Sequence, residues 1–160
     1  MYIDKYWEIS VGSTDDAMTF VDYLEFRNKK EVSLKEIFEE TGLSKLNGNY
    51  RQTDVSLEVK FDNCEAEIHY AIDTIGVLAA LILECKVNGY VNLHDLDSSK
   101  ADFCIIIIEA EAESNMIITA LKDYVENTCE YDIVEMMTED ELKDVIEGTE
   151  SLYRELIERS

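Results

Sequence analysis

The chain has 160 residues, of which 36 are acidic and 14 are basic, so its formal net charge at pH 7 is −22. A field this negative repels nucleic acids and anionic membranes and favours encounter with cationic partners. Because hydrophobic residues make up 46% of the chain, the composition argues against disorder and predicts one globular domain over residues 1–160.

The N-terminal residues lack the pattern of a secretory signal, which is a basic segment followed by an apolar run. The longest apolar stretch, residues 75–83, is far shorter than the roughly 20 residues that cross a bilayer. We therefore expect a cytoplasmic protein that makes no contact with membranes.

In chain order, the first predicted element is a strand over residues 6–11, which are rich in strand-forming side chains. A helix follows, with Ser13 or Thr14 as its N-cap and acidic residues in its first turn. A second, short helix over residues 34–41 is predicted by the capping box that begins at Ser33.

The clearest strand signal is the strict alternation of apolar and polar residues over 55–61. Residues 65–72 alternate again after a polar turn at residues 62–63. Two alternating segments around a short polar turn predict a β-hairpin.

The next segment is apolar on nearly every side, which predicts a helix at the centre of the domain, capped by Asp73 or Thr74. Residues 90–94 are predicted as a strand, and the β-branched run 103–108 as a fully buried strand. Residues 111–127 then have the periodicity of a helix.

A further strand is predicted at residues 131–136, followed by a capping box at Thr138 that begins the C-terminal helix. Gly148 predicts a break in that helix. The resulting order, βααββαββαβα, predicts an α+β (or mixed α/β) fold with a mixed, mostly antiparallel sheet flanked by helices.

The residues that carry chemistry in enzymes do not form a recognisable motif in this chain. No nucleophile elbow or glycine-rich phosphate loop is present, so we expect no enzymatic activity and no cofactor. The cysteines have no metal-ligand spacing and are predicted as free thiols, three of them buried: Cys64, Cys85 and Cys104. The two histidines also lack a ligand partner at metal spacing, so no metal site is expected.

An acidic loop contains Asp95, Asp97 and Asp102. Its composition is that of a loop that binds a hard cation, but it lacks the glycine and the terminal glutamate of an EF-hand. A solvated loop is the alternative interpretation.

A second acidic segment, Glu109, Glu111 and Glu113, follows the predicted buried strand. Its carboxylates suit the positive N-terminus of the next helix, or an anionic ridge that binds a basic partner. Residues 101–160 carry 17 acidic and 4 basic side chains, and this shortage of lysine favours a binding surface. Tyr131 lies in the same region, and tyrosine is enriched at interfaces. These residues and the acidic loop are therefore the predicted partner-binding site.

The N-terminal segment, Tyr-Trp-Glu-Ile at residues 6–9 followed by residues 12–16 and 20–24, resembles the immunity proteins of bacterial polymorphic-toxin and contact-dependent growth inhibition systems. The resemblance implies an inhibitor that covers the active site of a cationic toxin, such as a nuclease, with carboxylates in place of phosphates. Charge would then set the association rate, and a few buried aromatic residues the dissociation rate.

Three other functions stay open at this stage. A small-molecule or metal-sensing regulatory domain suits the mixed sheet, the apolar central helix and the free cysteines. An enzyme would need two carboxylates in unlike environments within one cleft. The third is a structural or adaptor role, and an apolar edge strand could support a homodimer.

Overall fold

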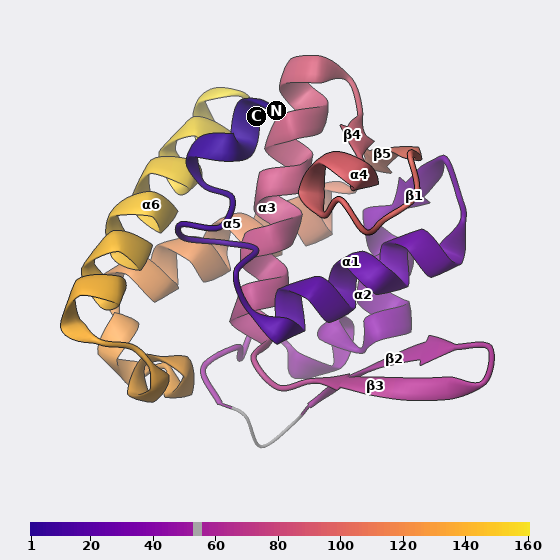
Figure 1. Ribbon diagram of the computed structural model, residues 1–160. Helices are drawn as coiled ribbons and strands as arrows, with labels where there is room; N and C mark the ends of the chain where they lie inside the picture. The colour runs from indigo at the N-terminus through magenta and orange to yellow at the C-terminus, as the bar shows by residue number, and fades with distance from the viewer. Residues whose placement is uncertain (53–55) are drawn as a thin grey trace.

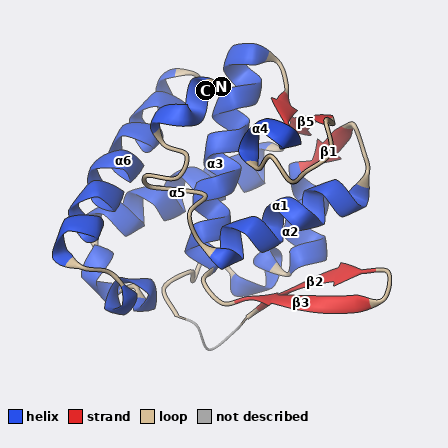
Figure 2. Ribbon diagram, viewed as in Figure 1, coloured by secondary structure: helices blue, strands red, loops and turns tan. Residues whose placement is uncertain are grey.

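The computed structural model describes residues 1–52 and 56–160, and its architecture is α+β, as predicted (Figures 1 and 2). Its helices are α1 (Asp15–Arg27), α2 (Leu34–Thr41), α3 (Ala71–Asn88), α4 (Leu93–Leu96), α5 (Glu111–Glu126) and α6 (Glu139–Glu158). Its strands are β1 (Glu31–Ser33), β2 (Leu57–Phe61), β3 (Cys64–Ile68), β4 (Val91–Asn92) and β5 (Cys104–Ile108). Short 3₁₀ helices occur at η1 (Tyr2–Lys5), η2 (Leu43–Leu46), η3 (Thr128–Glu130) and η4 (Asp132–Met136).

Helix α3 is the centre of the fold, which confirms the predicted central helix. It contacts α1, α5, α6 and β5, and it is buried along most of its length (Figure 1). The helix begins at Ala71, before the predicted caps. The Asp16 carboxylate accepts the backbone N–H groups of His69 and Tyr70, which directly precede the helix. This tertiary contact fixes the entry to α3, and the preceding strand ends earlier than predicted, at Ile68.

Strands β2 and β3 form the predicted antiparallel hairpin, with Leu57 opposite Ile68 and Phe61 opposite Cys64. Residue Val55, the predicted start of the hairpin, lies outside the described residues. In the described part of the chain a separate three-stranded sheet has the order β1-β5-β4. Strand β1 pairs with β5 in parallel, and β4 pairs with β5 antiparallel, so the sheets are mixed and mostly antiparallel, as expected.

The prediction that β5 is fully buried was wrong. Ile105 and Ile107 are buried towards α3, but Ile106 and Ile108 are 38% and 44% exposed on the other face. An uninterrupted run of isoleucine hides this difference between the two faces. Strand β4 is also shorter than predicted, because residues 93–96 form helix α4.

Neither of the two other predicted strands forms; residues 6–11 are a turn closed by an isolated β-bridge between Trp7 and Val11. In residues 6–11 the N–H groups of Ile9, Ser10 and Val11 all donate to the carbonyl of Tyr6, so this segment folds on itself as a tight N-terminal turn. At the second predicted strand, Asp132–Met136 form the 3₁₀ helix η4, with Tyr131 as its N-cap. Strand-forming composition was overridden in both places, because neither segment pairs with a strand of the part of the chain that the structure describes.

The cysteines are free, as predicted, but two of the three expected to be buried are exposed. Cys104 lies on the open face of β5, while Cys85 is partly buried. Cys64 shares the inward face of the hairpin with Ile68, but it is exposed because it lies at the turn between β2 and β3.

The N-terminal turn packs closely on the two longest helices. A β-carbon placed on Gly148 of α6 would lie 2.4 Å from Cβ of Ser10, and one on Gly76 of α3 would lie 3.0 Å from Val11. A β-carbon on Gly12 would lie 2.7 Å from the ring of Trp7. The indole N–H of Trp7 donates to the carbonyl of Leu96 at 3.0 Å. Helix α6 runs through Gly148 without the predicted break. The glycine serves the packing instead, because a side chain at this position would overlap the N-terminal turn.

We predict that Gly148→Ala destabilises the protein by about 1–3 kcal/mol, because the added methyl group overlaps Ser10. Intrinsic helix propensity alone would instead stabilise the variant by about 1 kcal/mol. Urea denaturation of Gly148→Ala, Ser10→Gly and the double variant measures the effect. The double variant should lose less stability than the sum of the two single variants. A Gly148→Ala protein at least as stable as the wild type would contradict the packing.

Candidate partner-binding surfaces

The predicted acidic loop lies beside the N-terminal end of β5. Asp95 is exposed on α4, and Asp102 accepts a hydrogen bond from the amide of Asn92 at 2.7 Å. Asp97 accepts the backbone N–H and the hydroxyl of Ser99, both at 2.8 Å, and these bonds lower its pKa. Within residues 1–52 and 56–160 no group of three or more His, Cys, Asp or Glu could hold a metal ion.

The second predicted segment lies at the opposite end of β5. Glu109 forms an ion pair with Lys86 at 2.5 Å, and Glu111 and Glu113 are in the first turn of α5. The four steps of β5 span about 13 Å, so the two acidic segments do not form one cluster. The exposed face of β5, with Ile106 and Ile108, lies between them.

Tyr131 belongs to the core rather than to an exposed surface. It is 3% exposed, its ring meets that of Tyr124 edge-on at 4.7 Å, and its hydroxyl donates to Asp123 at 2.7 Å. The residue therefore packs helix α5 against the following turns and presents no side chain to a partner in this structure.

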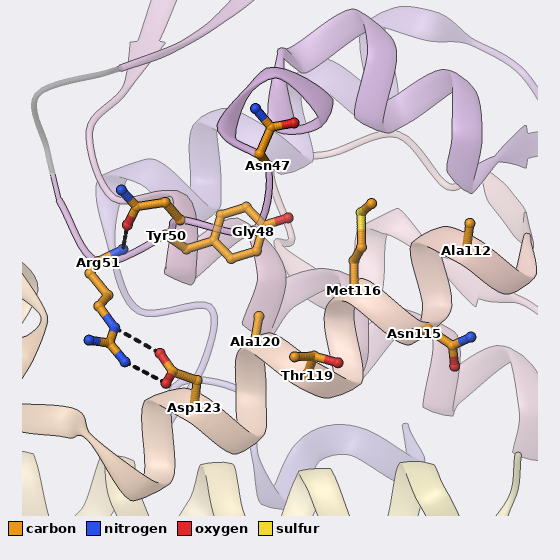
Figure 3. Close-up of a pocket in the computed structure, with 11 residues that line it drawn as sticks. Asn47, Gly48, Tyr50, Arg51, Ala112, Asn115, Met116, Thr119, Ala120 and Asp123 are labelled. Carbon is orange, nitrogen blue, oxygen red and sulfur yellow. Dashed lines mark hydrogen bonds and ion pairs between the residues drawn. The ribbon is translucent and has the colours of Figure 1, made fainter.

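A polar groove of about 610 Å³ lies between the loop at residues 47–51 and helix α5 (Figure 3). At one end Arg51 binds Asp123 through two hydrogen bonds, of 2.9 and 2.6 Å. Despite partial burial, the bonds from Arg51 and Tyr131 lower the pKa of Asp123 to about 2. This carboxylate is already neutralised within the chain, so the groove lacks the unpaired charge that would attract a basic partner.

A second cavity, which we call the acidic cleft, has a volume of about 620 Å³. It lies between the N-terminal turn, the first turns of α1, α3 and α6, and η4. Six carboxylates line it: Glu8, Asp15, Asp16, Asp73, Glu141 and Asp144. The described residues that line it include neither lysine nor arginine, while Ile9 and Met136 beside it are 56% and 71% exposed.

The acidic cleft was missed from the sequence because its carboxylates come from four distant segments. Several also have a local explanation: the Glu141 carboxylate accepts the Thr138 N–H in a capping box, and Asp15 and Asp16 lie in the first turn of α1. Glu8 has a backbone φ of 64°, which the sequence does not reveal. This conformation turns the chain sharply, and residues 8–9 line the cleft. No spacing in the sequence marks these residues as neighbours.

Comparison with protein families identifies the chain. It matches the family model of immunity protein 68 over residues 2–156, nearly its whole length. The chain belongs to the immunity protein 68 family. The predicted resemblance to immunity proteins is thereby confirmed, and neutralisation of a toxin is the function that membership indicates. Searches of curated proteins and of solved structures found no match. Among the described helices of this immunity protein, none is long and apolar enough to cross a membrane.

Asp73 is the most unusual carboxylate of the immunity protein's acidic cleft. Its Oδ2 atom is buried and has no hydrogen-bond partner among the described residues. Burial raises the pKa of Asp73 to about 6, and the negative charge of Asp16 adds to the effect, although a hydrogen bond with Thr14 opposes it. The ionised side chain is thus held at a free-energy cost to the folded protein.

We predict that Asp73→Asn raises the free energy of unfolding at pH 7.5 by about 1–3 kcal/mol. Because the pKa is raised on folding, wild-type stability should fall as the pH rises from about 4 to about 6, where the folded protein loses the proton. The advantage of the variant should therefore be present above pH 6 and disappear near pH 4.

Urea denaturation between pH 4 and pH 8 checks this prediction. Asp144→Asn is the matched control, because Asp144 lines the same cleft but is exposed. The control should change stability by less than about 0.5 kcal/mol. An Asp73→Asn advantage that is equal at both ends of the pH range would rule out the titration of Asp73 as its cause.

Proposed function

We propose that this immunity protein neutralises a basic toxin in the bacterial cytoplasm, and that the acidic cleft is its principal contact surface. The observation that carries the proposal is a cavity lined by six carboxylates, with no lysine or arginine among its described lining residues. Family membership supplies a toxin protein as the partner, and the net charge of −22 favours a basic one.

The acidic cleft combines the two features of a tight protein interface. Its carboxylates lie within one cavity, so their field attracts a cationic surface and speeds association. The exposed side chains of Ile9 and Met136 can be buried by the partner, which removes apolar surface from water and slows dissociation. The polar groove of Figure 3 offers exposed Met116 but no unpaired carboxylate.

A nuclease is the toxin class that suits this surface best. The active site of a nuclease is cationic because it binds phosphates, and clustered carboxylates can occupy the same positions. The carboxylates at the two ends of β5, with exposed Ile106 and Ile108 between them, form a second candidate contact surface. The two surfaces lie near opposite ends of α3, which is roughly 27 Å long (Figure 1). Mutations at one surface therefore leave the other unchanged, and the two can be tested independently.

We predict that the double variant Glu8→Lys/Asp144→Lys slows association with the cognate toxin at least tenfold at low salt. Both residues are exposed at the acidic cleft, and reversing them inverts the local field. The salt dependence of the association rate should fall as well. The toxin is first recovered by pull-down at low salt and at about 0.5 M salt, and rates are then measured by stopped-flow fluorescence.

The matched control is Glu39→Lys/Glu158→Lys, which changes the net charge equally at exposed sites outside both surfaces. It should slow association less than threefold. A third variant, Asp95→Lys/Glu111→Lys, tests the two ends of β5. If only this third variant slows association, the β5 surface is the contact, and the assignment to the acidic cleft is wrong.

A further inference from the structure

The acidic cleft contains a carboxylate, Asp73, of which one buried oxygen has no hydrogen-bond partner among the described residues. Other buried acids are satisfied internally: Glu84, 3% exposed, accepts the N–H of Ile3 at 3.0 Å and the amide of Asn88 at 2.6 Å. Asp16 accepts two backbone N–H groups. Within the described residues, Asp73 is the one carboxylate that has a buried oxygen with no hydrogen-bond partner.

A buried, unpaired carboxylate costs free energy that a bound cation would recover. Among the described residues that line the cleft, His69 is the one basic side chain, and neither lysine nor arginine is present. The cleft carboxylates also do not form a group that could hold a metal ion. A permanent cation that pairs with Asp73 is therefore best supplied by a side chain of a partner protein.

Arginine suits this position better than lysine. A guanidinium is planar, binds a carboxylate through two hydrogen bonds, and loses less hydration on burial than an ammonium group. The same chain contains one such pair, because Arg51 holds Asp123 through two hydrogen bonds. Arg27, 5% exposed, shows that a buried guanidinium also pairs with two separate carboxylates, those of Glu36 and Glu40.

The cleft can also accommodate the rest of an arginine side chain. Its volume of about 620 Å³ exceeds what one side chain needs, and the apolar parts of Ile9, Tyr70 and Met136 line it. Asp73 also lines a smaller cavity of about 40 Å³ that shares lining residues with the cleft. Its Oδ2 is covered in the free protein, so binding of the guanidinium requires neighbouring side chains to move. Met136 and Met137 line the cleft, and methionine side chains are flexible.

We propose that the acidic cleft receives an arginine side chain of the toxin, whose guanidinium pairs with the carboxylate of Asp73. This inference rests on the proposed function and names the chemistry that the cleft recognises. The exposed acids at the cleft attract the partner, whereas Asp73 holds one specific residue. Loss of Asp73 should therefore raise the dissociation rate, whereas loss of the exposed acids should lower the association rate.

The first test uses a small probe and does not need the toxin. The ¹⁵N-labelled immunity protein is titrated with N-acetyl-arginine methylamide at low salt, and amide chemical shifts are followed by NMR. Saturable shifts are expected at residues 8–16 and 69–73, with a dissociation constant in the millimolar range. N-acetyl-citrulline methylamide, a neutral analogue of similar shape, should bind at least tenfold more weakly, as should the lysine analogue.

The Asp73→Asn variant should lose at least ten-fold in affinity for the arginine probe, whereas Asp144→Asn should lose less than threefold. Equal binding of the arginine and citrulline probes, or an Asp73→Asn variant that binds like the wild type, would overturn the inference. Because Asp73→Asn is expected to be at least as stable as the wild type at neutral pH, a loss of binding would not reflect unfolding.

The second test uses the captured toxin and separates the two proposals. Asp73→Asn should raise the dissociation rate at least tenfold with little change in the association rate. If Glu8→Lys/Asp144→Lys slows association but Asp73→Asn dissociates like the wild type, the cleft binds the toxin without the arginine contact, and only the further inference fails. If neither variant changes toxin binding, the cleft is not the interface, and the proposed function of this surface fails first.

Discussion

The packing of the N-terminal turn against α3 and α6 is the contact on which the rest of the structure depends. Gly76 and Gly148 remove the side chains that would keep the turn away from both helices. The turn then closes over the N-terminal half of the core, where Trp7 is 6% exposed and bonded to Leu96. Because Glu8 lies within this turn, the same contact that completes the core also builds one wall of the acidic cleft.

The charge of the cleft follows from the arrangement of the helices around it. Helices α1, α3 and α6 all begin at the acidic cleft, and each has carboxylates in its first turn. The positive end of a helix dipole stabilises such groups by about 0.3–1 kcal/mol each. Three converging N-termini therefore offset part of the mutual repulsion of the acids, so the cleft can remain anionic without lysine.

Local signals in the sequence predicted those elements whose structure depends on neighbouring residues in the chain. The Thr14 cap, the hairpin alternation and the Thr138 capping box all formed as expected. The Ser33 capping box did not, because Ser33 makes no cap hydrogen bond and Glu36 pairs with Arg27 instead. Residues 6–11 and Gly148 failed for the same reason: a contact between distant segments decided their conformation.

The candidate site also depends on contacts between segments that are distant in the sequence. The sequence marked acids that are close together in the chain, and these lie at the two ends of β5, where Glu109 already has a lysine partner. The acidic cleft instead gathers acids from four segments of the chain, and four of the six lie in the first turn of a helix, where acids are common. What distinguishes Asp73 is the absence of a partner for a buried oxygen, which only tertiary structure can reveal. Such a group favours a partner that brings a cation and penalises one that does not, so it contributes specificity that net charge alone cannot provide.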